Sequence, residues 1–286
     1  MSALRMRSGV GLVAAQGRRR ASRPALLAAE LVVLLIALAA LAPGLFTSAD
    51  PLATDPAAAV LAPSADHWLG TDQQGRDVFA RVVHGARASL EIGVGATLVA
   101  VTAGVLLGLG AALAGRWIAT PLLRLVEVLL AFPGILLALL VISIVGNGTR
   151  EIALAIAVGA APGYARIVRA ETLRVRSAGF VESSIALGVA PGRIVGRHLL
   201  PNVVRPLLVL ATIGLGETIL AGSALSFLGM GPKPPTPEWG SAIADGRDYL
   251  ATAWWISFAP GAAIVATVVA VTVVGRGWHA RLGGGR

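Results

Sequence analysis

Cysteine is absent from the 286-residue sequence, and Lys233 is the single lysine. Without cysteine, disulfides, thiolate chemistry and cysteine-ligated metal sites are excluded. Charge is scarce too, because charged residues make up 14% of the chain and hydrophobic residues 56%. A mean hydropathy of +0.77 is too high for an ordinary soluble globule. We therefore expect an integral membrane protein.

No pattern in the sequence indicates catalysis. A phosphate-binding GxxxxGK[ST] loop does not occur, and the single lysine lies in a proline-rich stretch. The four histidines are scattered, without HExxH and without a His/Asp/Glu cluster at metal-ligand spacing. The serines have no recognisable triad partners. We expect no catalytic residues, no metal and no cofactor, which disfavours a membrane enzyme.

Six apolar segments are candidates for membrane crossings, since a helix of about 20 residues spans about 30 Å of hydrocarbon. We predict an all-α membrane protein with six transmembrane helices at residues 25–46, 92–115, 128–147, 152–165, 207–231 and 254–275. The fourth is short, and its Pro162-Gly163 pair predicts a kink. The first resembles a secretory signal, but Pro43 directly follows the small-residue site Ala40-Leu41-Ala42 and disfavours cleavage, so we expect a retained anchor.

The positions of the arginines predict the orientation. With both termini in the cytoplasm, most arginines fall on the inner side and most carboxylates on the outer side. The net charge of +9 then reflects topology, and no nucleic-acid partner is expected. The predicted order is a cytoplasmic tail (1–24), a first anchor (25–46), an extracytoplasmic segment (47–87), a five-helix core (88–280) with a cytoplasmic loop (170–202) and an outer loop (232–252), and a cytoplasmic tail (281–286).

A polar segment, FVESSIALGVAPGRIVGRHLLPN at residues 180–202, interrupts the apolar pattern. Residues 180–187 favour a short helix, Gly188 allows a bend, and Pro191 suits the first turn of a second helix that Leu200-Pro201 would end. The apolar face of this pair would consist of Val181, Ile185, Ile194, Val195 and Leu199. Taken alone, the pattern fits an interfacial linker, a DNA-reading helix-turn-helix, or a docking site for a cytoplasmic motor.

The segment resembles the cytoplasmic loop of bacterial ABC importer permeases, in which Glu-Ala-Ala is followed by a spaced glycine and a closing Leu-Pro. Glu182 opens the motif, two serines replace the alanines, and Gly188 is correctly placed. The His-x-Leu-Pro-Asn form, with His198, is similar to the dipeptide, oligopeptide and nickel branch. Further stretches that resemble this branch are HWLGTDQQGRD (67–77), GARASL (85–90), LLAFPGILLAL (129–139), PGYARIVR (162–169) and LSFLGMGPKPPTPEWG (225–240).

The resemblance implies the type I, MetI-like importer permease fold in a prokaryotic plasma or inner membrane. It implies a non-catalytic subunit that contacts membrane lipid and forms, with a homologous second permease, a path for di- or oligopeptides. An extracytoplasmic solute-binding protein would deliver the cargo, and two cytoplasmic ATP-binding cassette subunits would bind the ATP. Import of nickel chelates or glutathione by the same architecture is an alternative, as is an autonomous secondary transporter, which the lack of a membrane charge relay disfavours.

The resemblance also implies which residues meet the partners. Those expected to dock on an ATPase are Glu182, Ser183, Ser184, Ala186, Leu187, Gly188, Pro191 and Arg193. Those expected to face the binding protein are Asp72, Arg76, Asp77 and Trp239.

Two further expectations come from the residues themselves. Glu217 is the one acid deep in a predicted crossing, so it is a candidate for the translocation path. The alternatives for Glu217 are an ion pair with a basic group of a partner subunit and a purely structural role.

Gly104 and Gly108 form a GxxxG pattern, which predicts close packing of the helix that carries them.

Overall fold

The computed structural model describes residues 23–282, which are helical apart from loops and an isolated β-bridge between Thr71 and Asp77. The α-helices are α1 (Arg23–Leu41), α2 (Val78–Leu113), α3 (Arg116–Ala131), α4 (Gly134–Val145), α5 (Thr149–Arg176), α6 (Gly179–Ala186), α7 (Pro191–Ile194), α8 (Leu200–Leu225), α9 (Trp239–Gly246) and α10 (Trp255–Leu282). Short 3-10 turns occupy Pro43–Leu45, Pro56–Ala58 and Arg247–Tyr249, and π-helical turns occupy Val195–Leu199 and Ser226–Met230. The predicted tails, 1–24 and 281–286, lie almost entirely outside the described residues.

Five helical runs in the described part of the chain are long and apolar enough to cross a membrane: α1, α2, α5, the run Pro191–Met230 and α10 as far as Trp278. α3 and α4 add a sixth crossing if this pair, bent by 100°, is one span. The prediction of an all-α membrane protein is confirmed, but the prediction of a single continuous helix at 128–147 is wrong. Phe132 has an extended backbone because the proline that follows it disfavours the helical conformation.

Two of the predicted crossings are parts of much longer helices. α2 begins at Val78 instead of residue 92, and the Asp77 carboxylate caps it by accepting a hydrogen bond of 2.8 Å from the Ala80 N–H. α5 extends to Arg176 and continues through Pro162, so the predicted loop at 170–202 begins within this helix.

Leu200-Pro201 does not end a helix, contrary to the prediction. The chain passes from α7 through the π-helical turn Val195–Leu199 directly into α8, and the Leu200 N–H bonds to the Val195 carbonyl. A π turn widens the helix by one residue, and such turns are a known way for a helix to bend where its regular hydrogen-bond ladder is interrupted. Pro201, which lacks an N–H, therefore fits into the first turn of α8.

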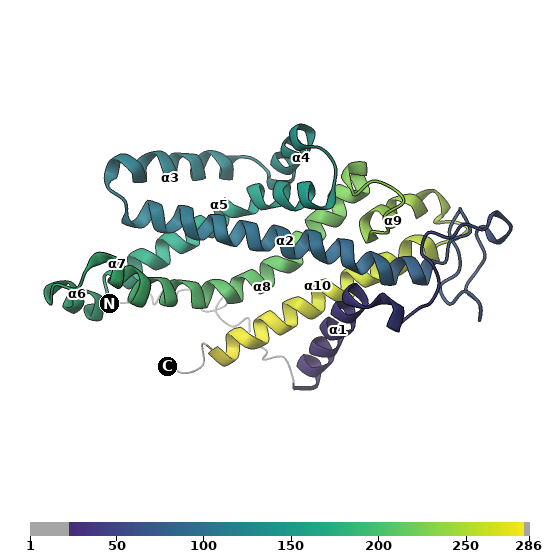
Figure 1. Ribbon diagram of the computed structural model, residues 1–286, viewed down its shortest axis with the longest axis horizontal. Coiled ribbons are helices and arrows are strands. Elements are labelled where there is room, and N and C mark those ends of the chain that lie inside the picture. Colours follow the sequence, from purple (N-terminus) through teal and green to yellow (C-terminus); the bar gives the residue numbers. More distant parts are fainter. Residues whose placement is uncertain (1–22, 283–286) are drawn as a thin grey trace, which may run out of the picture.

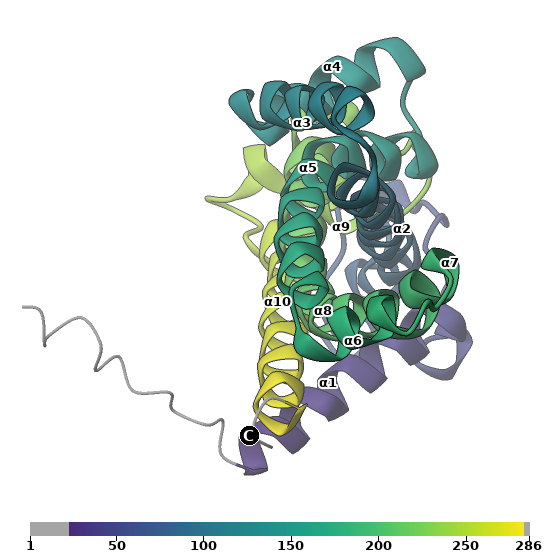
Figure 2. The same ribbon diagram turned by 90° about the vertical axis from the view of Figure 1, so that its left-hand side faces the viewer.

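α2 and α5 form the centre of the bundle. A methyl group on Gly104 would lie 2.4 Å from Cβ of Tyr164, and one on Gly108 would lie 2.6 Å from the Ala165 carbonyl oxygen. The close approach predicted from GxxxG is therefore present. Figures 1 and 2 show α3 and α4 on one side of this central pair and α1 with α10 on the opposite side.

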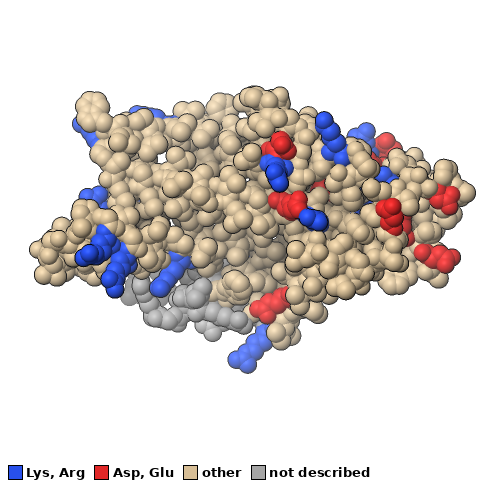
Figure 3. Space-filling view, viewed as in Figure 1, with Lys and Arg blue, Asp and Glu red and all other residues tan. Residues whose placement is uncertain are grey.

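The two ends of the elongated molecule differ in charge. In Figure 3, arginines gather at the end formed by α6 and α7, whereas acidic side chains gather toward the opposite end. That opposite end carries the segment before α2 and the helix α9 (Figure 1). This separation supports the predicted orientation, in which the arginine-rich end lies in the cytoplasm.

Candidate functional site

The polar segment between α5 and α8 forms two short helices at one end of the molecule, in front of the bundle in Figure 2. Gly188 joins them with φ of +77°, a left-handed conformation that favours glycine. Pro191 occupies the first turn of α7, where its missing N–H leaves no helical hydrogen bond unmade. The bend and the second helix start are thus where the sequence predicts them.

The underside of this segment is anchored by apolar side chains. Val181, Ile194 and Leu199 are buried together with Val175 of α5. The prediction that Ile185 belongs to the same face is wrong, because this side chain is 54% exposed. α6 and α7 are therefore attached through one buried face to the inner end of α5 and the start of α8.

The outer side of the segment is open to solvent. The predicted docking residues are exposed except for Ser184, which is half-buried. Leu187 is 83% exposed, and Phe180 and Ile185 are further exposed apolar side chains of this segment. The hydroxyls of Ser183 and Ser184 each donate a 2.8 Å hydrogen bond to the carbonyl four residues earlier. The two serines therefore satisfy their polar groups locally.

A cavity of about 430 Å³ lies between α4, α5 and α8. Its walls are mostly aliphatic and include four glycines: Gly134, Gly159, Gly163 and Gly214. The polar side chains on the walls are those of Tyr164, Glu217 and Thr218, and no Lys or Arg lines it. The sequence indicated Glu217 alone; the other members are brought together only by helix packing.

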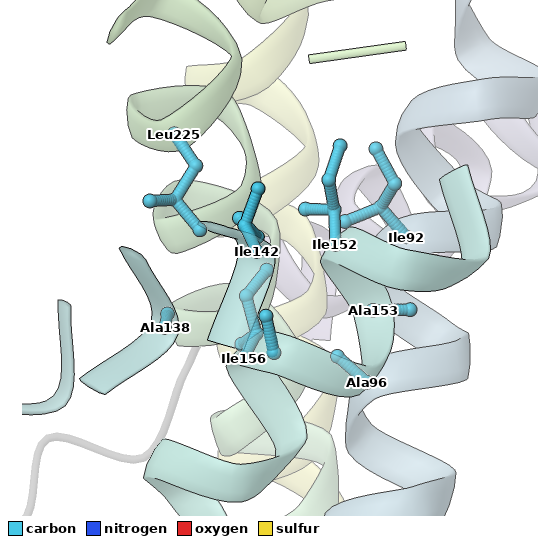
Figure 4. Close-up of a cluster of buried hydrophobic side chains, with 9 residues drawn as sticks. Ile92, Ala96, Ala138, Ile142, Ile152, Ala153, Ile156 and Leu225 are labelled. Atoms are coloured by element: carbon cyan, nitrogen blue, oxygen red, sulfur yellow. The ribbon is translucent and has the colours of Figure 1, made fainter. Parts of the chain in front are cut away.

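A packed apolar cluster adjoins this cavity, and Figure 4 shows its side chains. Ala138 of α4, Ile156 of α5 and Leu225 of α8 belong both to this cluster and to the cavity wall. The cluster lies near the start of α5 and the end of α8, which is the end away from α6 and α7. The cavity is thus bounded by side chains on the side of the acidic end of the molecule.

Glu217 and Thr218 are neighbours on α8 with opposite surroundings. Thr218 is buried, and its hydroxyl bonds to the Gly93 carbonyl and the Thr97 hydroxyl of α2, each at 2.9 Å. Glu217 is exposed, and no hydrogen bond or ion pair joins it to another residue in the range 23–282. Thr218 therefore fixes α8 against α2, and the adjacent carboxylate is left available at the cavity.

Buried charges hold the outer segment on α2. Asp72, which is 2% exposed, accepts a hydrogen bond of 2.6 Å from Nε of Arg76 and lies 3.5 Å from Nε of Arg81. The Asp245 carboxylate of α9 lies 3.9 Å from both guanidinium groups. Partial burial raises the pKa of Asp245, although the two arginines oppose that shift.

The four residues expected to face a binding protein are therefore mainly structural. Asp72 and Arg76 are buried, and Asp77 caps α2 while bonding to Nδ1 of His67 at 2.9 Å. Trp239 is 2% exposed, and its indole N–H donates to the Val82 carbonyl. Direct contact of Asp72, Arg76 and Trp239 with a partner does not fit this burial, and the prediction is corrected accordingly.

Glu238 is a structural residue that sequence reasoning did not identify. It is 1% exposed and caps α9 by accepting hydrogen bonds from the N–H groups of Gly240 and Ser241, each at 2.9 Å. The Ser89 hydroxyl of α2 donates to the same carboxylate at 2.9 Å. A carboxylate directly before Trp-Gly-Ser is a recognisable N-cap signal, whereas its bond to α2 depends on the fold.

Comparison with known proteins gives a family match over most of the chain. Residues 104–284 match the family described as binding-protein-dependent transport system inner membrane component. The dipeptide transport system permease protein DppC of Alkalihalophilus pseudofirmus is 40% identical over 247 residues, covering 86% of this chain and 81% of the relative. The glutathione transport system permease protein GsiD of Pectobacterium atrosepticum is 39% identical over 215 residues, covering 75% of this chain and 71% of the relative.

A solved structure shows the same fold. A chain in an inward-facing conformation of the MetNI methionine ABC transporter superposes with a TM-score of 0.57 at 22% identity. The superposition covers 68% of this chain and 93% of that one.

Proposed function

The chain belongs to the family of binding-protein-dependent transport system inner membrane components, and we propose that its cargo is a di- or oligopeptide. It is a non-catalytic, multi-pass permease of an ATP-binding cassette importer that has separate ATPase subunits. The similarity to dipeptide and other peptide permeases over most of the chain supports this cargo. Glutathione is the second candidate, because a glutathione permease is nearly as similar.

The exposed helix pair α6 and α7 is the proposed ATPase docking site. It projects from the arginine-rich end of the molecule, and its buried underside is packed on α5 and continuous with α8. α5 and α8 also form two walls of the cavity. A closing ATPase dimer that displaced the docking helices would therefore move the cavity walls directly. The proposal rests on this direct connection of α6 and α7 to α5 and α8.

The face that carries Glu217 is the proposed contact with a homologous second permease. An exposed carboxylate in the middle of a membrane-spanning helix is expensive to place in lipid, so such residues face a protein partner or a water-filled cavity. Glu217 lies well inside the run Pro191–Met230 and is exposed in the isolated chain. A path between two permeases would give Glu217 both a protein partner and a water-filled cavity as neighbours.

The acidic end is the proposed contact with the extracytoplasmic binding protein. Its surface residues include Trp68, which is 66% exposed, and Leu52 and Leu61, which are each more than 40% exposed. Asp72, Arg76, Asp77 and Trp239 would support this surface by fixing the segment before α2 and helix α9, without forming the contact themselves.

Two variants of the docking helices test the function. Glu182→Lys reverses an exposed charge on α6, and Gly188→Pro is incompatible with the positive φ at the bend. Both should insert and fold in the membrane, yet lose peptide uptake and cargo-stimulated ATP hydrolysis in the reconstituted importer. Matched controls are Glu127→Lys, on the exposed face of α3, and Gly115→Ala, between α2 and α3, where an added methyl group meets no atom within 4 Å.

Normal uptake in both docking variants would contradict the role of α6 and α7. Uptake driven by an ion gradient in liposomes that hold this chain and no ATPase would contradict the importer mechanism for this protein and favour a secondary transporter.

A further inference from the structure

The environment of Glu217 points to a particular chemical group in the cargo. When it is ionised, this carboxylate accepts hydrogen bonds and cannot donate them. No Lys or Arg lines the cavity at which it lies, and no residue in the range 23–282 forms an ion pair with it. A carboxylate in a low-dielectric setting is stabilised by a cation that donates hydrogen bonds. We infer that Glu217 binds the protonated amino group of the cargo as it passes through the membrane.

The shape of the cavity favours a cargo molecule over a single side chain of the partner permease. Its volume of about 430 Å³ falls in the range of small-molecule sites, which extends from about 300 to 1,000 Å³. Each of the three helices contributes a glycine to the lining: Gly134, Gly159 and Gly214. The result resembles a typical ligand site in being mainly apolar with few polar groups.

The polar groups are arranged on facing helices. Glu217 is on α8, and the hydroxyl end of Tyr164, on α5, packs against Gly214, which is about one turn before Glu217 on α8. No hydrogen bond joins the Tyr164 hydroxyl to another residue in the part of the chain that the structure describes. An ammonium group has three N–H donors, so the carboxylate and the phenolic oxygen are suitable acceptors for it.

The cavity also sets an orientation for the cargo. The carboxylate at the other end of a peptide would be repelled by Glu217 and would find no cationic side chain on these walls. The amino end is therefore expected at Glu217, with aliphatic side chains of the cargo against the apolar wall formed by residues such as Ile135, Ile156 and Leu210. This inference rests on the proposed peptide cargo.

The test compares two probes that differ only at the amino group. One is tri-alanine, and the other is propionyl-Ala-Ala, in which hydrogen replaces that amino group. Transport of each is measured with the complete importer and its binding protein in proteoliposomes, and the ratio of the two rates is compared between the unaltered chain and Glu217→Gln. Because the binding protein is the same throughout, a change in this ratio reports on the permease.

We expect Glu217→Gln to lower the preference for tri-alanine about tenfold, as when a charge-assisted hydrogen bond becomes a neutral one. Glu217→Asp should keep much of the preference. The matched control is Glu91→Gln, the same change on α2 at an exposed carboxylate that pairs with Arg87, and it should leave the ratio unchanged.

An unchanged ratio in Glu217→Gln would overturn the inference. Loss of the second permease from the purified Glu217→Gln complex would also overturn it, because that loss would assign Glu217 to an ion pair between subunits. If the unaltered importer transports neither tri-alanine nor any other di- or oligopeptide, the proposed peptide cargo is contradicted, and the inference fails with it.

Discussion

A network of buried, paired charges holds the acidic end of this protein together. The Asp72 carboxylate accepts hydrogen bonds from the N–H groups of Gln74 and Arg76 and from the Arg76 side chain, in addition to its contact with Arg81. Burying a charge is costly unless it is paired and hydrogen-bonded. Asp72 and Arg76 meet both conditions, whereas Arg81 is paired but its Nη1 has no hydrogen-bond partner in the described part of the chain. Removing Asp72 would leave the two buried arginines with the more distant Asp245 carboxylate alone.

We predict that Asp72→Ala lowers the free energy of unfolding of the purified protein by about 3–5 kcal/mol, because the two buried arginines then lose their nearer counter-ion and keep only the Asp245 carboxylate, 3.9 Å from each. Glu91→Ala removes a carboxylate from an exposed pair with Arg87 and should cost about 0–1 kcal/mol. Thermal unfolding in detergent measures both. Equal effects of the two substitutions would show that the Asp72 network does not hold this end together.

Sequence reasoning located these residues but assigned them the wrong surroundings. Asp72, Arg76 and Trp239 stand in loop-like stretches, where polar and aromatic residues commonly meet partners. Their burial arises because α2 and α9 pack against the segment that precedes α2, and such contacts between distant parts of the chain leave no periodic signal. Glu217, by contrast, is visible in the sequence as one acid within an apolar run, and its place in the translocation path stays a prediction.

At the scale of helices, the packing of α2 on α5 depends on two glycines. A methyl group on Gly108 would lie 2.6 Å from the Ala165 carbonyl oxygen and 2.7 Å from Cβ of Val168. Atoms of the neighbouring backbone cannot move aside as the end of a flexible side chain can. The two helices would therefore have to separate.

Gly108→Ala should destabilise the protein by about 1–3 kcal/mol through overpacking. Gly95→Ala, also on α2, is the matched control, because its added methyl group would lie at an ordinary distance of 3.4 Å from Cβ of Ala153. The control should be neutral or stabilising by up to about 1 kcal/mol, the difference in helix propensity. The melting temperatures of the two variants give the comparison, and a Gly108→Ala protein as stable as the control would contradict the close approach.

The number of apolar segments was predictable, but the effect of each proline was not. Pro133 ends α3 and turns the chain by 100°, whereas α8 and α10 continue through Pro206 and Pro260. A proline costs a helix one hydrogen bond, and whether the helix breaks depends on how neighbouring elements satisfy the freed groups. The π turn before Pro201 is one such solution, and it explains why the predicted end of the docking segment was wrong.

For the whole molecule, charge and motif order were sufficient to predict the family. The stretches that resemble peptide permeases extend from residue 67 to residue 240, and the family match and the related permeases confirm that resemblance. The cavity could not be predicted, since its walls come from three helices that are separated in sequence and are mostly aliphatic. Its connection to α6 and α7 through α5 and α8 becomes visible only in the folded chain.

If α6 and α7 form a cytoplasmic docking site for the ATPase, a single cysteine placed on them is accessible from the cytoplasm and is covered by the bound ATPase. The chain has no cysteine, Leu187 is 83% exposed on the docking segment, and Asp66 is exposed at the acidic end. Leu187→Cys and the control Asp66→Cys are treated with a membrane-impermeant maleimide in spheroplasts and in inside-out vesicles, with and without the ATPase subunits.

We predict that Leu187→Cys reacts only in inside-out vesicles and is protected when the ATPase is bound, while Asp66→Cys reacts in spheroplasts. Labelling of Leu187→Cys in spheroplasts, or labelling in vesicles that is the same with and without the ATPase, would contradict the account.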